Sequence, residues 1–366
     1  MLLDQIAAAF DRQDYKLAAE LLKTFLHQSP QDPWGQVYRA KLYEVSGRIE
    51  DAKAIYQNIL RTVTSSKIIS MTRSQLQQLQ DREQSERRAA IAQAKSAPEN
   101  AEPGVLILEA IALESRQKAA QAMSQIFNLD AYTARLQIPN TGWKLYRAGA
   151  IGELQLYGQQ LRAEKIPCFW TKENQLNSLP VFEIKYFLDY EPQASVVCHN
   201  QQGQLGSLTF DWSEVSQRVE GMLPILENVV DSSMRQGIQR QRKEQTQDYV
   251  RICDLHLPKR RCILRICDWK YSFDQGLEFV SMGNNTIDLD DKINRLHWNS
   301  LLTFLNAQIK SKPVWSDFTV FAESAIDSPF LLKRIPAKIS AYGQNSELWD
   351  SAFQLYSCLA FLRDSI

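Results

Sequence analysis

Two segments near the start of the chain repeat one arrangement of small and large residues. Ala18 and Ala52 lie 34 positions apart, and four residues after each comes a large side chain, Leu22 or Tyr56. Pro30 follows the first segment. The recurrence at this spacing indicates an internal repeat of helical segments, although two ordinary amphipathic helices would also show it.

This pattern resembles the tetratricopeptide repeat. The sequence departs from that motif at Gln13, which replaces the turn glycine, and at Thr64, which replaces a second terminating proline. About three repeats are needed to bury the core of a repeat array. We therefore expect the helix predicted from Lys67 to Lys95 to cap the two hairpins and to connect them to the rest of the chain.

The resemblance implies a short concave surface that holds a peptide or a helix of a partner protein. On the first helix of the second unit, this surface would be lined by Trp34, Val37, Lys41 and Glu44. A plain bundle of four or five helices without a binding groove is the alternative that the sequence leaves open. The resemblance does not imply catalysis.

The chain is long enough for more than one hydrophobic core, and its pattern changes along its length. We expect a multidomain protein: helical-hairpin repeats, then a small β-α-α-β-α-β domain, then an antiparallel β sandwich closed by a helix. The expected boundaries are 1–95 for the repeats with their connecting helix, 96–104 for a polar linker, 105–180 for the small α/β domain, 181–312 for the β domain and 313–366 for a C-terminal extension with a final packing helix.

The middle region contains apolar segments of strand length, "VLILEAIA", "GWKLYRAGA" and "IPCFW", separated by helical patterns. Their order is similar to the C-terminal domain of the bacterial ribosomal stalk protein and to the small adaptor of the bacterial caseinolytic protease. Both relatives dock other proteins. No acidic peptide-binding residue of that adaptor can be placed on this chain.

From Val181 to Asp274 seven short segments alternate or run apolar, which predicts strands, and an amphipathic helix follows from Ile293 to Ile309. This order resembles a pleckstrin-homology-like domain. A simple curved antiparallel sheet covered by a helix is the alternative.

The residue types that catalysis needs do not occur in a recognisable arrangement. Cys198 and His199 are adjacent, but neighbours on a strand point to opposite faces. Asp288–Asp291 lacks the ligand spacing of a calcium loop and is interpreted as a helix cap. The six cysteines form no CxxC pair and are expected to be reduced and buried. We therefore expect no enzymatic activity, no cofactor and no bound metal.

Basic residues concentrate between Met234 and Arg265, although the chain as a whole has 42 basic and 42 acidic residues. These basic residues form two clusters, in "RQGIQRQRKEQTQ" and in "LPKRRC". If both clusters project from one edge of the sheet, they form a patch that binds the phosphates of nucleic acid or of an anionic membrane. A solvated charged loop is the alternative. The candidate anion-binding residues are Arg240, Arg242, Lys243, Lys259, Arg260 and Arg261.

No uninterrupted apolar run reaches the length of a membrane span, and the first residues lack the pattern of a secretory signal. The expected protein is a cytoplasmic adaptor, scaffold or assembly factor. It would join protein partners, within a larger complex, and would take no small-molecule substrate.

Overall fold

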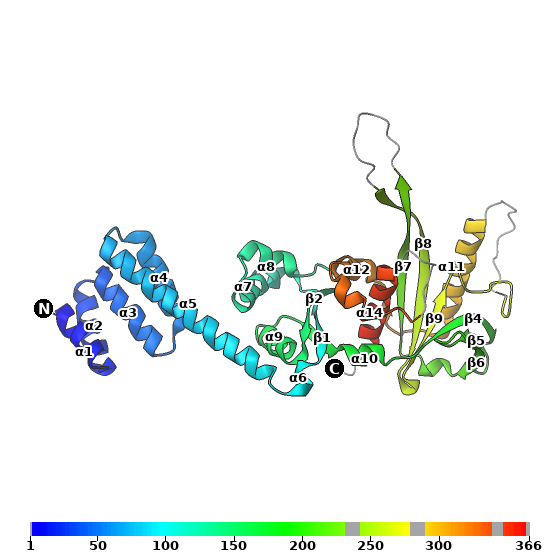
Figure 1. Ribbon diagram of the computed structural model, residues 1–366, viewed down its shortest axis with the longest axis horizontal. Helices are drawn as coiled ribbons and strands as arrows, with labels where there is room; N and C mark the ends of the chain where they lie inside the picture. The colour runs from blue at the N-terminus through cyan, green and yellow to red at the C-terminus, as the bar shows by residue number, and fades with distance from the viewer. Residues whose placement is uncertain (1, 231–241, 279–289, 339–346, 364–366) are drawn as a thin grey trace, which may run out of the picture. The chain divides into compact units, whose positions relative to one another are not determined.

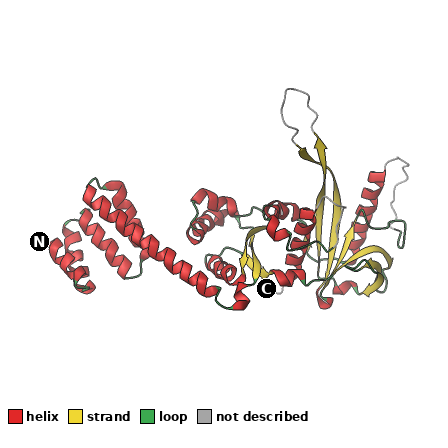
Figure 2. Cartoon of the chain, in the orientation of Figure 1, coloured by secondary structure: helices red, strands yellow, loops and turns green. Residues whose placement is uncertain are grey.

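The computed structural model describes residues 2–230, 242–278, 290–338 and 347–363, and within these ranges the side chains of 226–230, 242–247, 290–294 and 347 are not described. The chain forms two compact units, Met1–Gln93 and Ala94–Ile366. The first is helical and is called the helical unit below. The second contains two sheets with helices and is called the α/β unit (Figures 1 and 2). This layout confirms the predicted sequence of helical repeats followed by regions that contain sheets.

The helical unit consists of consecutive hairpins. Its helices are α1 (Leu2–Asp11), α2 (Tyr15–Gln28), α3 (Pro33–Val45), α4 (Ile49–Thr62) and α5 (Ser66–Ala94). Local sequence fixes the starts of α2 and α3: the Asp14 carboxylate accepts from the Leu17 N–H, and the Asp32 carboxylate accepts from the Gly35 N–H. Each carboxylate satisfies a backbone N–H that the first turn of a helix leaves without a partner.

The two hairpin turns share one backbone conformation. Gly47, between α3 and α4, has φ 77°, and Gln13, between α1 and α2, has φ 57°. Glycine adopts this left-handed region without steric cost, whereas the side chain of Gln13 makes the same conformation unfavourable. The first hairpin therefore keeps the turn conformation of the motif although glutamine replaces the glycine.

The first part of the α/β unit has the predicted order of elements. It contains α6 (Pro98–Ala101), β1 (Pro103–Glu109), η1 (Leu113–Ser115), α7 (Arg116–Phe127), α8 (Ala131–Gln137), β2 (Trp143–Ala150), α9 (Ile151–Ala163), β3 (Cys168–Lys172) and α10 (Glu173–Asn177). The sheet has the order β2-β1-β3, and β1 is antiparallel to both neighbours. The stretch 96–104, which was expected to be a linker, carries α6 and the start of β1.

The remaining strands hydrogen-bond into one seven-stranded sheet in the order β10-β7-β8-β9-β4-β5-β6. They are β4 (Val181–Asp189), β5 (Ala194–His199), β6 (Leu205–Phe210), β7 (Gln217–Val230), β8 (Arg242–Leu257), β9 (Cys262–Cys267) and β10 (Val314–Trp315), with η2 (Trp212–Glu214) before β7 and η3 (Pro258–Arg260) before β9.

This sheet corrects the expected antiparallel sandwich. Two strand pairs, β4 with β9 and β10 with β7, are parallel. Residues 270–274, which were expected to form a strand, form turns. The reason lies in β9, whose six residues "CILRIC" are all buried. A strand that is buried on both faces belongs in the middle of a sheet covered on both sides by helices, where parallel pairing is common.

Helices cover both faces of the large sheet (Figure 1). On one side α11 (Asp290–Gln308) packs in a core with the odd-numbered residues of β8, such as Cys253 and Leu255. On the other side lie α12 (Phe318–Ile326), α13 (Pro329–Leu332) and α14 (Glu347–Arg363). The predicted helix cap at Asp288–Asp291 falls partly outside the described residues, and α11 begins at Asp290.

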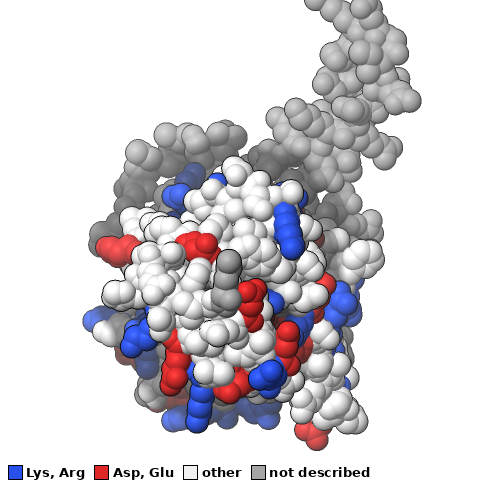
Figure 3. All heavy atoms as spheres, turned by 90° about the vertical axis from the view of Figure 1, so that its left-hand side faces the viewer, with Lys and Arg blue, Asp and Glu red and all other residues white. Residues whose placement is uncertain are grey.

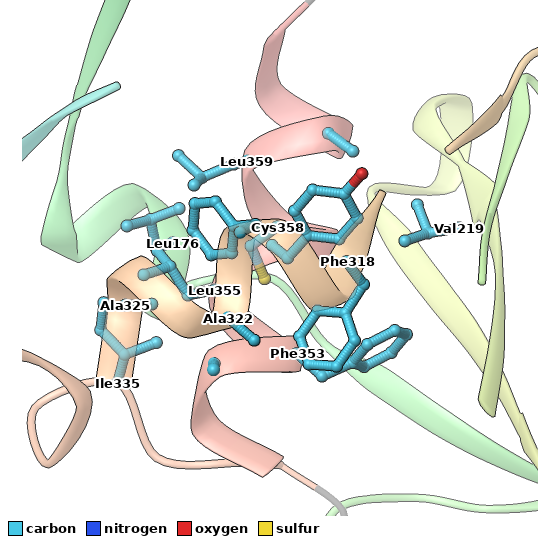
Figure 4. Packing of buried hydrophobic residues seen from close by; sticks show 14 of the residues in the cluster. Leu176, Val219, Phe318, Ala322, Ala325, Ile335, Phe353, Leu355, Cys358 and Leu359 are labelled. Carbon is cyan, nitrogen blue, oxygen red and sulfur yellow. The ribbon is translucent and has the colours of Figure 1, made fainter. Parts of the chain in front are cut away.

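Helix α14 is buried on every side from Ser351 to Ala360. Its core joins residues of the small sheet, such as Val105, to residues of the large sheet, such as Val219 (Figure 4). The predicted regions 105–180 and 181–312 therefore lie within one compact unit. Each large apolar side chain buried here contributes roughly 1.5–3 kcal/mol to folding.

A buried ion pair lies on the sheet face that meets α14. Arg265 on β9 is directly opposite Asp254 on β8. The Arg265 Nε donates to Asp254 Oδ1 and its Nη2 donates to Oδ2, both at 2.8 Å. The side chains are 1% and 0% exposed. Phe353 of α14 lies 5.0 Å from the guanidinium, measured to the ring centroid. Because both charges have lost water, each depends on the other.

Ser357 on α14 extends the ion pair into a chain of hydrogen bonds. Its hydroxyl donates to Asp254 Oδ2 at 2.5 Å. The His256 Nε2–H donates to the Ser357 hydroxyl at 3.0 Å, and the Gln217 amide donates to His256 Nδ1 at 3.0 Å. Because a protonated amide nitrogen cannot accept, this order requires the neutral His256 tautomer with its proton on Nε2.

Gln217, at the start of β7, completes the network. Its Nε2 also donates to the Ala360 carbonyl at 2.7 Å, and its Oε1 accepts from the Trp315 indole N–H at 2.8 Å. An indole N–H only donates, so it fixes the orientation of the amide. The network thus ties β7, β8, β9 and β10 to α14.

Burial lowers the pKa of His256 from 6.5 to about 4. The Asp254 carboxylate opposes this shift, and the Arg265 guanidinium reinforces it. His256 is therefore neutral at pH 7, as its tautomer in the network requires.

Removal of one partner of the ion pair should destabilise the α/β unit strongly. We expect Arg265→Met to lower the free energy of unfolding by about 3–5 kcal/mol, because Asp254 is left as an unpaired buried carboxylate. The double variant Arg265→Met with Asp254→Leu should regain most of this loss. Chemical denaturation of the three proteins measures both effects, and a single variant as stable as the wild type would contradict the assignment.

The contribution of His256 to the stability of the α/β unit should fall as the pH drops from 6.5 to 4. Over this range the unfolded chain binds a proton at His256 that the folded chain does not, which costs up to roughly 3 kcal/mol. His256→Gln should remove this component. Burial raises the pKa of Asp268 to about 6, which acts with the opposite sign in the same range. Subtracting the variant's unfolding free energy from that of the wild type at each pH cancels Asp268, and a flat difference would contradict the expectation.

Candidate protein-binding site

The hairpin packing of the helical unit follows the predicted motif. The small residues Ala18 and Ala52 are fully buried, and the large residues Leu22 and Tyr56 are buried beside them. The small positions therefore lie in the interior, where the motif requires close approach between the helices of each hairpin.

One side of α3 presents residues that recur every three or four positions, Trp34, Tyr38, Lys41 and Val45. The first three are half-buried, and Val45 is 51% exposed. These residues, together with Phe10 of α1, are called the α3 face below.

Aromatic contacts connect α1, α3 and α5 across this face. The rings of Phe10 and Tyr38 stack with centroids 5.2 Å apart and planes 28° apart. The Lys41 ammonium lies 5.8 Å from the Tyr38 ring centroid, and the Lys67 ammonium of α5 lies 5.8 Å from the Trp34 ring centroid. Such cation–π contacts contribute about 0.5–1 kcal/mol at exposed sites. They hold both lysines over the aromatic rings.

The charges around the α3 face have both signs. Burial raises the pKa of Tyr38, and Asp11 and Asp4 act in the same direction. Figure 3, which looks at the chain from the left-hand side of Figure 1, shows acidic and basic side chains intermingled among uncharged ones. The face therefore has no single dominant charge, and its most distinctive feature is the group of aromatic rings.

Two of the four predicted site residues do not belong to the open face. Val37 is 0% exposed and lies in the core with Ile68 and Leu79 of α5. Glu44 accepts a hydrogen bond from the Tyr56 hydroxyl of α4. The prediction is corrected here because these two positions are rotated around α3 toward α5 and α4. Tyr38 and Val45 take their places.

The described backbone segments of the predicted basic patch lie far apart. Arg242 and Lys243 begin β8, whereas η3 follows its end at Leu257, and 16 residues of strand span about 50 Å (Figure 1). Arg240 and the side chains of Arg242 and Lys243 lie outside the described parts of the chain. Phosphate binding by these three residues therefore stays a prediction.

At the other end of β8, one of the candidate anion-binding residues, Arg260, is paired with a carboxylate. The Arg260 Nε and Nη2 donate to the two oxygens of Glu214 at 2.7 Å and 2.6 Å. The hydrogen bonds from the Arg260 guanidinium and from the Asp211 backbone N–H lower the pKa of Glu214 to about 2. Arg261 adopts a left-handed turn conformation with φ 51°. Arg260 therefore has a structural role in this turn.

The buried network contains a serine, a histidine and an aspartate, but not in the roles of a catalytic triad. The Ser357 hydroxyl donates to Asp254, and His256 donates to Ser357 and so cannot accept its proton. All three residues are fully buried or nearly so. A substrate therefore has no access to the Ser357 hydroxyl, and the geometry of the network suits a structural role.

Other candidate chemistry is also placed by the structure. The six cysteines are buried and form no disulfide bond, and burial raises the pKa of the Cys198 thiol. Within the described residues, no group of three or more His, Cys, Asp or Glu side chains is arranged to hold a metal ion. Among the same residues, no helix is long and apolar enough to cross a membrane.

Residues 9–71 match the tetratricopeptide repeat family. This match supports the prediction for the N-terminal region and indicates a module for protein–protein interaction. No curated protein and no solved structure matches the chain. The resemblances expected for the middle and C-terminal regions therefore rest on the order of their elements alone.

Substitutions on α3 should separate the core from the α3 face. Val37→Ala should lower the free energy of unfolding of the helical unit by about 2 kcal/mol, because it removes buried methyl groups and leaves a cavity. Val45→Ala, the matched change at an exposed position, should alter it by less than about 0.5 kcal/mol. Thermal unfolding measures both, and equal effects would contradict the assigned orientation of α3.

Proposed function

We propose that this chain is a non-catalytic adaptor or assembly factor that binds a segment of a partner protein on the α3 face. The observation that carries the proposal is the group of half-buried aromatic rings of Phe10, Trp34 and Tyr38, contributed by the first helices of consecutive hairpins. The match of this region to the tetratricopeptide repeat supports the same use.

The composition of the face limits the kind of partner. Aromatic residues with a partly buried body and an exposed edge are the residues that most often dominate binding energy. Lys41 and Lys67 lie beside them. The fitting partner is a helix or extended tail with one or two apolar anchors for the rings and acidic residues for the lysines.

The α/β unit supplies the second contact of the adaptor in this proposal. Two compact units in one chain give two surfaces, and linked surfaces raise the effective concentration of one partner at the other. We propose that the protein works in the cytoplasm within a larger complex, with proteins as its partners.

Tyr38→Ala should weaken partner binding at least about tenfold without unfolding the helical unit, because it removes the ring on which Phe10 stacks. Partners captured by the intact protein would be identified, purified and titrated against each variant by calorimetry. Trp34→Ala should have a similar effect.

Leu17→Ala is the control, since Leu17 of α2 is 44% exposed and lies in the helical unit outside the α3 face. It should leave this affinity unchanged. The proposed site would be refuted if a purified partner bound the wild type, Tyr38→Ala and Trp34→Ala with equal affinity while both substituted proteins kept the wild-type melting temperature.

A further inference from the structure

Strand β6 is an edge strand. It is the last strand of the large sheet and pairs with β5. Within the described residues no other strand pairs with its outer edge. The backbone groups of an edge strand that point away from the sheet are ready to pair with another strand.

The register identifies the groups that point outward. The Asn200 N–H donates to the Gln204 carbonyl, which makes these residues a hydrogen-bonded pair at the end of the hairpin. Such pairs alternate with non-hydrogen-bonded pairs along an antiparallel ladder. Counting along the register, Leu205, Ser207 and Thr209 direct their N–H and C=O groups away from β5. All three are exposed.

This edge lacks the features that normally block edge pairing. From Asn200 to Phe210 the sequence "NQQGQLGSLTF" contains no charged residue and no proline. The pairing of β5 with β6 runs through six residue pairs without a bulge. Charged residues, prolines and bulges are the usual protection of an edge strand. Their joint absence indicates that the edge is used.

We propose that β6 pairs with β6 of a second copy of this chain, antiparallel about a two-fold axis at Ser207. The outward groups fit this arrangement, because Ser207 then faces its own counterpart and Leu205 faces Thr209 of the other copy. About six backbone hydrogen bonds form. The two seven-stranded sheets become one continuous sheet.

The charge pattern favours a second copy over a different partner. In a two-fold pairing the residue on the axis faces the same residue of the other copy and its neighbours lie near theirs, so a charged position near the axis would meet a like charge. Strand β6 has none. On the face toward the core, Leu208 would lie beside Gly206 of the other copy. A side chain at Gly206 would meet no atom of its own chain within 4 Å, so this space is open.

The expected dimer is weak. A six-residue strand buries less surface than the roughly 1,600 Å² of a standard stable interface. We therefore expect a monomer–dimer equilibrium that shifts over micromolar to millimolar protein concentration.

Substitutions at Ser207 test the pairing in the full-length protein. Ser207→Lys should weaken dimerisation roughly tenfold or more, because two lysines then oppose each other at the axis. Ser207→Glu should do the same. An equimolar mixture of the two variants should restore a dimer with one copy of each, because the charges are then opposite. Sedimentation equilibrium over a concentration series measures all four samples.

Ser195→Lys is the matched control, since Ser195 lies on the same sheet face on β5 and contacts Thr209. It should dimerise like the wild type. Hydrogen exchange at the Ser207 amide should slow as the concentration rises. A wild type that stays monomeric throughout the series, or a Ser207→Lys variant that dimerises as the wild type does, would overturn the proposal. A monomeric wild type that binds another protein's strand at this edge would also overturn it.

Discussion

The buried ion pair between Arg265 and Asp254 is the contact on which the α/β unit depends most. It places two charges away from water, and it is stable only while Ser357 and Phe353 of α14 lie against it. The helix is therefore held in one position along the sheet, since a shift by one turn would leave both charges without these partners. Because α14 also packs against the small sheet, the same contact fixes the relation between the two sheets of this unit.

The helical unit is built on a different principle. Its hairpins rest on the size of side chains: Ala18 and Ala52 permit close approach, and Leu22 and Tyr56 fill the adjacent space. Its polar contacts, such as the Asp14 and Asp32 caps, fix where helices begin. Packing by size leaves one side of α3 partly exposed between α1 and α5, and on that side the aromatic rings of the α3 face gather.

The two proposed surfaces follow from what each unit leaves uncovered. A helical repeat exposes the side of its first helices, and this side offers side-chain contacts to a partner's anchors. A sheet exposes an edge, and the edge of β6 offers backbone groups that a second strand can pair. A dimer through β6 would present two α3 faces and would increase the avidity for a partner with repeated binding segments.

The sequence by itself determined the hairpins, the order of elements in the small sheet and six of the strands of the large sheet, because these depend on local periodicity and on the Ala18 to Ala52 spacing. It also contained an overlooked signal: Asp254, His256 and Arg265 alternate with apolar residues in strands that are otherwise suited to burial. Only the tertiary structure decided which side of α3 is partly exposed, because the rotation of a helix depends on what packs against it. Val37 is therefore buried, whereas Tyr38 is half-buried. The tertiary structure also decided the parallel pairing of β4 with β9 and the separation of the two basic clusters. Strand pairing and the distance between residues in space depend on contacts between distant parts of the chain, which local pattern does not specify.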